Sequence, residues 1–216
     1  MSRRLAFIAG PVLGVFANLA LSSPAPVTDL NFRVLLDGKP IGQHRFELRG
    51  DGDTREVLSQ ADFKVRFLFM DVYRYRHTAL ERWRGGCLIF MDARTDDNGN
   101  IETVDARRRG DGLAVKATRR QGVYEGCVRS FAYWNPRILD GGRLLNAQTG
   151  EYLLVRVQSL GPERVPVDGK PAVAERYRLT GKDIDIDLWY TRDKQWVALE
   201  SRVDDGHRLR YERNRP

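Results

Sequence analysis

The sequence predicts an all-β protein: a single large curved antiparallel sheet or an open β-barrel, with one irregular junction in mid-chain and little helix. Three observations predict this class. Polar and apolar residues alternate over long runs, as they do in strands with one packed face and one wet face. Clusters of Gly, Asn and Asp separate the runs. No segment after the N-terminal region has the pattern of a helix longer than two turns, and long twisted sheets curl or close.

The N-terminal segment predicts a cleavable export signal. Residues 2–4 (Ser-Arg-Arg) are positive, residues 5–21 are uncharged and mostly apolar, and residues 20–22 (Ala-Leu-Ser) suit a signal peptidase. A membrane anchor is the alternative, and the glycines and proline inside the run weaken it. We therefore expect a periplasmic or secreted protein made of a signal peptide (1–22), a linker (23–29) and a single β-sheet domain (30–216).

Composition limits the partners. A chain of 216 residues with 42% hydrophobic content can form one good core. The net charge of +7 comes from 36 Lys and Arg against 29 Asp and Glu, and the arginines are spread along the chain. Such a spread is typical of solvated strand faces, and it also favours transient contact with an anionic membrane surface. No basic block with interleaved aromatic residues is present, so we expect no nucleic-acid partner.

Cys87 and Cys127 are the only cysteines. In an exported chain such a pair predicts a disulfide, because an oxidising compartment preserves it. The alternative is a reactive thiol near His77 or His44.

The alternating runs predict about a dozen strands in simple succession. In the best of them Phe63, Val65, Phe67 and Phe69 point to one face. In the next run Tyr73, Tyr75 and His77 share a face. The predicted strands are 32–36, 41–48, 54–69, 73–83, 87–95, 102–107, 113–118, 153–157, 173–179, 184–190, 196–203 and 209–211.

Two acidic segments could suggest a metal site. Residues 96–100 (Asp-Asp-Asn-Gly-Asn) are acid-rich, but they lack the glycine position and the final glutamate of an EF-hand, and Asn98-Gly99 predicts a tight hairpin turn. Asp183, Asp185 and Asp187 alternate with apolar residues, which predicts a wet strand face beside cross-strand arginines rather than a cation site or an acid-base pair. The same alternation places Trp189 on the wet face. We expect no metal and no cofactor.

The alternation stops between Val123 and Glu151, where a Cys, a Trp, an Asn-Pro and an Asn-Ala-Gln-Thr-Gly stretch occur together. We refer to this segment as the junction. It joins two β-rich halves, and its aromatic and amide side chains predict either a plug over the core or a functional site. Pro136 prevents ladder pairing there, and residues 137–147 could hold one short helical turn.

These segments resemble an exported bacterial family catalogued as domain of unknown function 6134. The resemblance is carried by GCVRSFAYWNP at 126–136, LLNAQTGE at 144–151, VLLDGKPIGQHRFEL at 34–48, and LWY followed by WVALES near the end. It implies an envelope protein and supplies no activity. The final strands are also loosely similar in rhythm to LolA-like lipoprotein carriers, in which a curved sheet holds acyl chains, although this chain lacks that family's long helices.

The leading functional hypothesis is a protein that binds a lipid or other apolar ligand in the concave face of the sheet, with Trp134 at the mouth. One alternative is an envelope enzyme whose polar groups converge under the junction. Another is an assembly factor that binds protein through a sheet edge. The predicted lining residues are Phe63, Phe67, Tyr73, Tyr75, Trp134 and Trp196, and the polar groups are His77, Asn135, Asn146 and Gln148.

Overall fold

The computed structural model describes residues 26–50, 53–67, 70–203 and 206–214, without the side chains of 66, 67, 70 and 71. The predicted export signal lies outside the described residues, as does the first part of the linker. The first strand begins at Val27, three residues before the predicted start of the domain. Within the described residues, no helix is long and apolar enough to cross a membrane.

Fifteen strands and one short 3₁₀ helix make up the described chain. The N-terminal half contains β1 (Val27–Leu36), β2 (Lys39–Arg49), β3 (Thr54–Phe67), β4 (Met70–Arg84), β5 (Cys87–Asp97), β6 (Asn100–Arg109), β7 (Gly112–Ala117) and β8 (Gln121–Glu125). The rest contains β9 (Arg129–Ser130), η1 (Pro136–Asp140), β10 (Gly142–Leu145), β11 (Tyr152–Val167), β12 (Lys170–Gly181), β13 (Ile184–Tyr190), β14 (Trp196–Arg202) and β15 (Arg208–Arg213).

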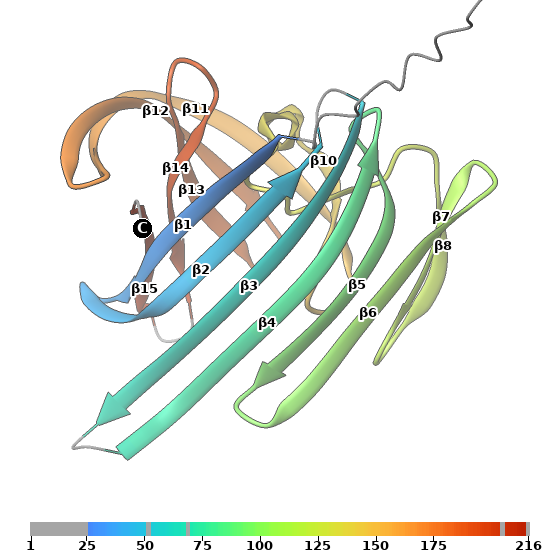
Figure 1. Cartoon of the computed structure of the whole chain (residues 1–216), viewed down its shortest axis with the longest axis horizontal. Helices are drawn as coiled ribbons and strands as arrows, with labels where there is room; N and C mark the ends of the chain where they lie inside the picture. Colours follow the sequence, from blue (N-terminus) through green and yellow to red (C-terminus); the bar gives the residue numbers. More distant parts are fainter. Residues whose placement is uncertain (1–25, 51–52, 68–69, 204–205, 215–216) are drawn as a thin grey trace, which may run out of the picture.

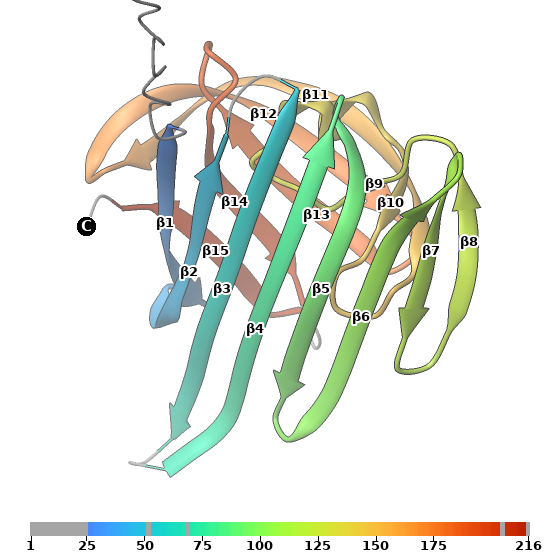
Figure 2. The ribbon, with the colours of Figure 1, turned by 45° about the vertical axis from the view of Figure 1, so that its right-hand side comes forward.

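All fifteen strands form one sheet that curls into an open barrel, as Figures 1 and 2 show. The strand order is β8-β7-β6-β5-β4-β3-β2-β1-β15-β14-β13-β12-β11-β10-β9. Every neighbouring pair is antiparallel except β9 and β10, which run parallel. The predicted all-β fold is confirmed, but the sheet is mixed, because the chain passes through η1 between β9 and β10 and returns in the same direction.

β8 and β9 are the two edge strands of the sheet, and side chains bridge the seam between them. The rings of Tyr124 and Tyr152 lie 4.4 Å apart, centroid to centroid. Arg120 pairs with Glu151 at 3.0 Å. The predicted Cys87–Cys127 disulfide is present and joins the start of β5 to the residues before β9, with a Cα–Cα distance of 5.0 Å. The sheet therefore stays open, and the seam is bridged by side-chain contacts and a disulfide rather than by a continuous ladder.

The barrel has two different ends. We call the end with the β4–β5 turn, the disulfide and η1 the closed end, at the top of Figure 1. The opposite end, which carries the β5–β6 and β10–β11 turns, is the open end. The β5–β6 turn is the predicted Asn98-Gly99 hairpin: both residues have positive φ (52° and 92°), and Asp97 pairs with Asn100. Such a turn matches the twist of the strands that it joins.

Alternation fills the barrel with apolar side chains. Inward positions of every long strand contribute to one buried cluster, in which Phe32, Leu88, Met91, Leu188 and Trp196 are almost fully buried. The junction belongs to the same cluster through Trp134, Ile138, Leu144 and others. It therefore packs as part of the core, as in the plug interpretation.

The wet-face prediction for Trp189 is wrong. The outer half of the β11–β12 hairpin folds over the outer face of β13 and β14, and the N–H of Asp168 at its tip donates to the carbonyl of Arg213 at 3.2 Å. A second, small apolar cluster results, in which Trp189 is 1% exposed. Its indole N–H donates to Glu163 at 3.1 Å. The other members of this outer cluster are Val165, Ala174, Val197 and Ala198.

The aspartate row is also less uniform than predicted. Asp183 is exposed in the β12–β13 turn, but Asp187 is only 6% exposed. Its carboxylate accepts hydrogen bonds from Arg176 at 2.5 Å and Arg178 at 2.8 Å. The predicted cross-strand arginines are present, and they satisfy a buried charge that unpaired would be costly.

Candidate functional site

Three predicted residues gather on the inner face of β3 and β4. The rings of Phe63 and Tyr75 stack at 5.3 Å with an interplanar angle of 11°. The His77 ring follows 6.4 Å from Tyr75. Nearby, the Tyr73 hydroxyl donates to Asp97 at 2.7 Å. The side chain of Phe67 lies outside what the structure describes. These residues share a face because cross-strand partners in the ladder point the same way.

The junction adds one predicted residue to this group. The Tyr75 hydroxyl donates to Gln148 Oε1 at 3.2 Å. Asn146 holds the turn that presents Gln148, because its side-chain oxygen accepts from the N–H groups of Gln148 at 2.8 Å and Thr149 at 3.3 Å. Gln148 therefore lies at the open end, whereas Asn146 serves its own loop.

Trp134 and Asn135 lie at the closed end instead. Trp134 is 8% exposed and meets Trp83 edge to face at 5.4 Å, with the Arg55 guanidinium over its ring. Asn135 caps η1 by accepting from the N–H of Arg137 at 3.1 Å. The predicted position of Trp134 at the mouth is wrong, because the junction runs along the barrel from one end to the other. His77, Asn135, Asn146 and Gln148 thus do not converge.

Trp196 occupies the middle of the core. It is 1% exposed, its ring lies 4.0 Å from Phe32 and 5.4 Å from Tyr133, and its N–H donates to the carbonyl of Ala198. A ligand could contact it only after core side chains moved. Of the ten predicted residues, the open-end group is Phe63, Tyr73, Tyr75, His77 and Gln148.

Sequence reasoning missed a row of polar residues that crosses the inner face of β2 to β6. We call this the histidine row, and register gives its members as His44, Ala61, His77, Thr95 and Glu102. His44 Nε2 lies 2.7 Å from Ser59 Oγ, and its Nδ1 lies 3.3 Å from the Tyr211 hydroxyl. His77 Nδ1 lies 2.8 Å from Thr95 Oγ1. Counting cross-strand partners from each predicted turn could have identified the histidine row from the sequence.

Both histidines of this row are neutral at physiological pH. Burial lowers the pKa of His44 to about 3, with a smaller contribution from His77. Burial also lowers the pKa of His77 to about 4. Within the described chain, no group of three His, Cys, Asp or Glu residues is arranged to hold a metal ion. The two histidines therefore offer neutral hydrogen-bonding groups.

Glu81 is a second polar group in the core. Its carboxyl group accepts from the Trp83 indole N–H at 2.9 Å and from the Ser130 hydroxyl at 3.0 Å. Burial raises the pKa of Glu81 to about 7, although these two hydrogen bonds act in the opposite direction. Because Ser130 belongs to β9, this carboxyl group ties the start of the junction to β4.

The inner face at the open end is lined by two further rows. The tyrosine row consists of Gly42, Phe63, Tyr75, Asp97 and Asn100. The aliphatic row, on the opposite half of the sheet, consists of Val157, Leu179, Ile186, Ser201 and Leu209. Several apolar side chains near this end pack against the core but stay partly exposed, namely Ile41, Tyr75, Val157, Ile184, Ile186 and Leu209.

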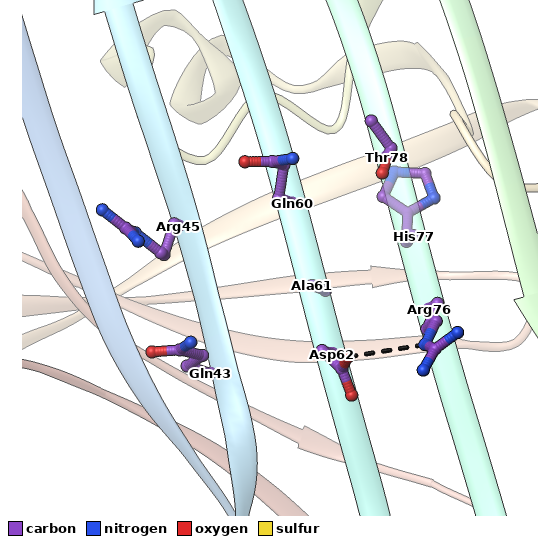
Figure 3. A pocket seen from close by; sticks show the side chains of 8 residues that line it. All are labelled: Gln43, Arg45, Gln60, Ala61, Asp62, Arg76, His77 and Thr78. Atoms are coloured by element: carbon purple, nitrogen blue, oxygen red, sulfur yellow. Dashed lines mark ion pairs between the residues drawn. The ribbon is translucent and has the colours of Figure 1, made fainter.

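Two hollows formed by the described residues lie elsewhere, on the outer face of β1 to β4. One, of 290 Å³, is shown in Figure 3. Its exposed side chains alternate with the buried His77 and Ala61, and Arg76 pairs with Asp62 at 3.4 Å. The other, of 490 Å³, lies beside it and shares Gln43 and Asp62. Both are polar surface depressions, and neither is lined by the predicted aromatic residues.

Comparisons with known proteins identify the family of the chain and a related fold. A family model described as "Domain of unknown function (DUF6134)" matches residues 32–214. The chain belongs to the DUF6134 family. This confirms the resemblance found in the sequence and defines a domain of unknown function with a β-barrel-like fold.

A solved structure is similar to this DUF6134 chain. It is the crystal structure of a β-barrel-like protein of domain of unknown function DUF1849 from Brucella abortus. The TM-score is 0.63 at 10% sequence identity, and the match covers 88% of this chain and 96% of that chain. At this identity the likeness concerns the fold alone, and it agrees with the loose barrel resemblance. No curated protein matches the chain.

Proposed function

We propose that this protein binds a lipid or other apolar, amphipathic molecule at the open end of its barrel. The observation that carries the proposal is the contrast between the two ends of one inner face. At the closed end the junction covers the core, and Trp134 and Ile138 are buried. At the open end Phe63 and Leu179 are buried, but Tyr75, Ile186 and Leu209 keep part of their surface in contact with water.

The chemistry of the open end suits an acyl chain. The aliphatic row faces the interior opposite the stacked rings of Phe63 and Tyr75, so an acyl chain between them would contact apolar surface on both sides. Each methylene group removed from water contributes about 0.8 kcal/mol. Apolar surface left uncovered on a monomer often marks a binding site.

We also propose that the chain is exported. The N-terminal pattern of a positive segment, an apolar run and small residues supports this, and so does the disulfide, because such bonds persist mainly in oxidising compartments. N-terminal sequencing of protein isolated from its own cells should find Ser23 as the first residue. Intact protein in the membrane fraction would contradict the proposal.

Binding can be tested with two fluorescent probes that share one polyene tail, cis-parinaric acid and cis-parinaryl alcohol. At least one should show saturable fluorescence enhancement at micromolar concentration. Ile186→Trp, which adds bulk to the partly exposed aliphatic row, should weaken this binding by at least about tenfold, a change worth roughly 1.4 kcal/mol.

Leu154→Trp is the matched control, because Leu154 lies on β11 with 55% of its surface exposed and outside the inner core cluster. It should leave binding unchanged. Thermal unfolding followed by circular dichroism would verify that both variants fold. If neither probe binds, the inner face is an ordinary core, and an assembly factor acting through the exposed edge of β8 becomes the better hypothesis.

A further inference from the structure

Resting on the proposed function, we infer that the open end selects amphiphiles whose polar head is uncharged, such as an alcohol, ester or amide. Free fatty acids and phosphate-bearing lipids should be disfavoured. The inference rests on which side chains the sheet register turns inward around the mouth.

The three rows on the inner face differ from the outer face of the same strands in their charges. Among the described residues, the histidine row, the tyrosine row and the aliphatic row contain no lysine or arginine. Near the open end the arginines of these strands lie at outward positions, whereas Arg55 of β3 lies at the closed end over the Trp134 ring. Arg76 pairs with Asp62 and Arg178 with Asp187 on the outer face. An anionic head group inside the mouth would therefore have no counter-charge.

The charged members of the three rows, Asp97 and Glu102, are both acidic. Asp97 lies in the tyrosine row beside Tyr75, and its carboxylate accepts a hydrogen bond from the Tyr73 hydroxyl. Glu102 ends the histidine row, and Arg119 from the β7–β8 turn pairs with it at 2.8 Å, so these two charges cancel. A carboxylate or phosphate entering here would meet repulsion from Asp97 and no compensating attraction.

The two histidines of the histidine row would be cations only if they were protonated. His44 and His77 are both buried and engage Ser59, Tyr211 and Thr95 through their ring nitrogens. Burial lowers the pKa of each far below neutrality, so they carry no charge at physiological pH. They act as neutral donors or acceptors in the wall of the barrel.

One group is available to recognise a neutral head. Oε1 of Gln148 accepts a hydrogen bond from the Tyr75 hydroxyl, so the amide NH₂ group of Gln148 points away from that bond. This NH₂ group can donate to the oxygen of an alcohol, ester or amide at the mouth. An uncharged head then gains a hydrogen bond, whereas an ionised head must lose its hydration without a compensating charge.

The test compares cis-parinaryl alcohol with cis-parinaric acid at pH 8, where the acid is ionised and both carry the same tail. We expect the alcohol to bind with at least about tenfold lower Kd. Gln148→Lys places an ammonium group at the mouth and should reverse the preference, so that the acid binds more tightly than the alcohol. Gln158→Lys adds the same charge at an exposed position of β11 and should change neither affinity.

The outcomes separate the two proposals. If the native protein binds the acid as tightly as the alcohol, or more tightly, the inference about the head group is overturned while ligand binding stands. The same holds if Gln148→Lys and Gln158→Lys affect the acid equally. If neither probe binds, both proposals fail.

Discussion

The two ends of the barrel are built in different ways. The closed end depends on specific bonds made by irregular chain: a disulfide, the Asn135 cap of η1, and the Ser130–Glu81 hydrogen bond. The open end depends on repetition, because cross-strand register stacks similar side chains into rows. The comparison teaches that one strand pattern can serve two purposes. At the closed end the junction completes the core, and at the open end several inward-facing side chains, such as Tyr75 and Ile186, stay partly exposed.

The largest effect should follow from removing the disulfide at the closed end. It links residues 40 positions apart, and the chain-entropy model gives a loop of this size about 4 kcal/mol of stabilisation. We expect Cys87→Ser/Cys127→Ser to lose a comparable amount in urea unfolding, with a steeper slope because the unfolded chain without the cross-link is less compact. A loss under about 1 kcal/mol would mean that the junction holds the closed end by packing alone.

A matched pair of isoleucines compares the ends directly. Ile138 in η1 is 2% exposed, and Ile138→Ala should cost about 3 kcal/mol because it leaves a cavity. Ile186 in the aliphatic row is only partly buried, so Ile186→Ala should cost about 1 kcal/mol. Urea unfolding of both variants tests this difference. Equal costs would show that the open end is packed as tightly as the closed end.

The third prediction concerns the pH dependence of stability and Glu81. Burial raises the pKa of this carboxyl group to about 7 in the folded state, whereas an unfolded glutamate titrates near 4.5. The folded protein therefore holds the proton more tightly, and stability from this group is lost as pH rises from about 4.5 to about 7. Glu81→Gln removes the titration, so wild type should weaken relative to the variant by on the order of 2 kcal/mol over this range.

The quantity to measure is the difference in unfolding free energy between wild type and Glu81→Gln. The buried histidines change the stability of both proteins with pH in the opposite direction. His44 and His77 have pKa values lowered from 6.5, so their contribution is lost as pH falls below about 6.5. Both proteins share that loss, and it cancels in the comparison. A difference that stays constant from pH 4.5 to pH 7 would show that Glu81 does not titrate in this window.

Local pattern was enough to predict twelve of the fifteen described strands and most turns, whereas β8, β9 and β10 were not predicted. The alternation of polar and apolar residues around Phe63 and Tyr75 depends on neighbours in sequence, and so does the Asn98-Gly99 turn. The structure confirms both. The parallel β9–β10 pair and the burial of Trp189 depend on the path of the junction and on a hairpin that folds back. Neither has a signature within a short window of sequence.

The candidate site was predicted in part for the same reason. Phe63, Tyr75 and His77 share a face by simple alternation, so their grouping follows from the sequence. Gln148 reaches Tyr75 only because the junction spans the barrel, which also carries Trp134 to the other end. The contact of His44 with Tyr211 has no local signature, because it joins β2 to β15, far away in sequence.

The strand order has a consequence for how the chain folds. Strands β1 to β8 each pair with their sequence neighbours, and so do β10 to β15, so each half can assemble from local hairpins. One long-range pairing, β1 with β15, joins the halves, and it brings together residues such as Arg33 and Glu212, 179 positions apart. Because distant contacts are slow to form, this central pairing should limit the folding rate. A circular permutant would join the end of β15 to the start of β1 and begin beside Gly126. Its strands would follow one another in their spatial order, so the slow long-range pairing would become a local one.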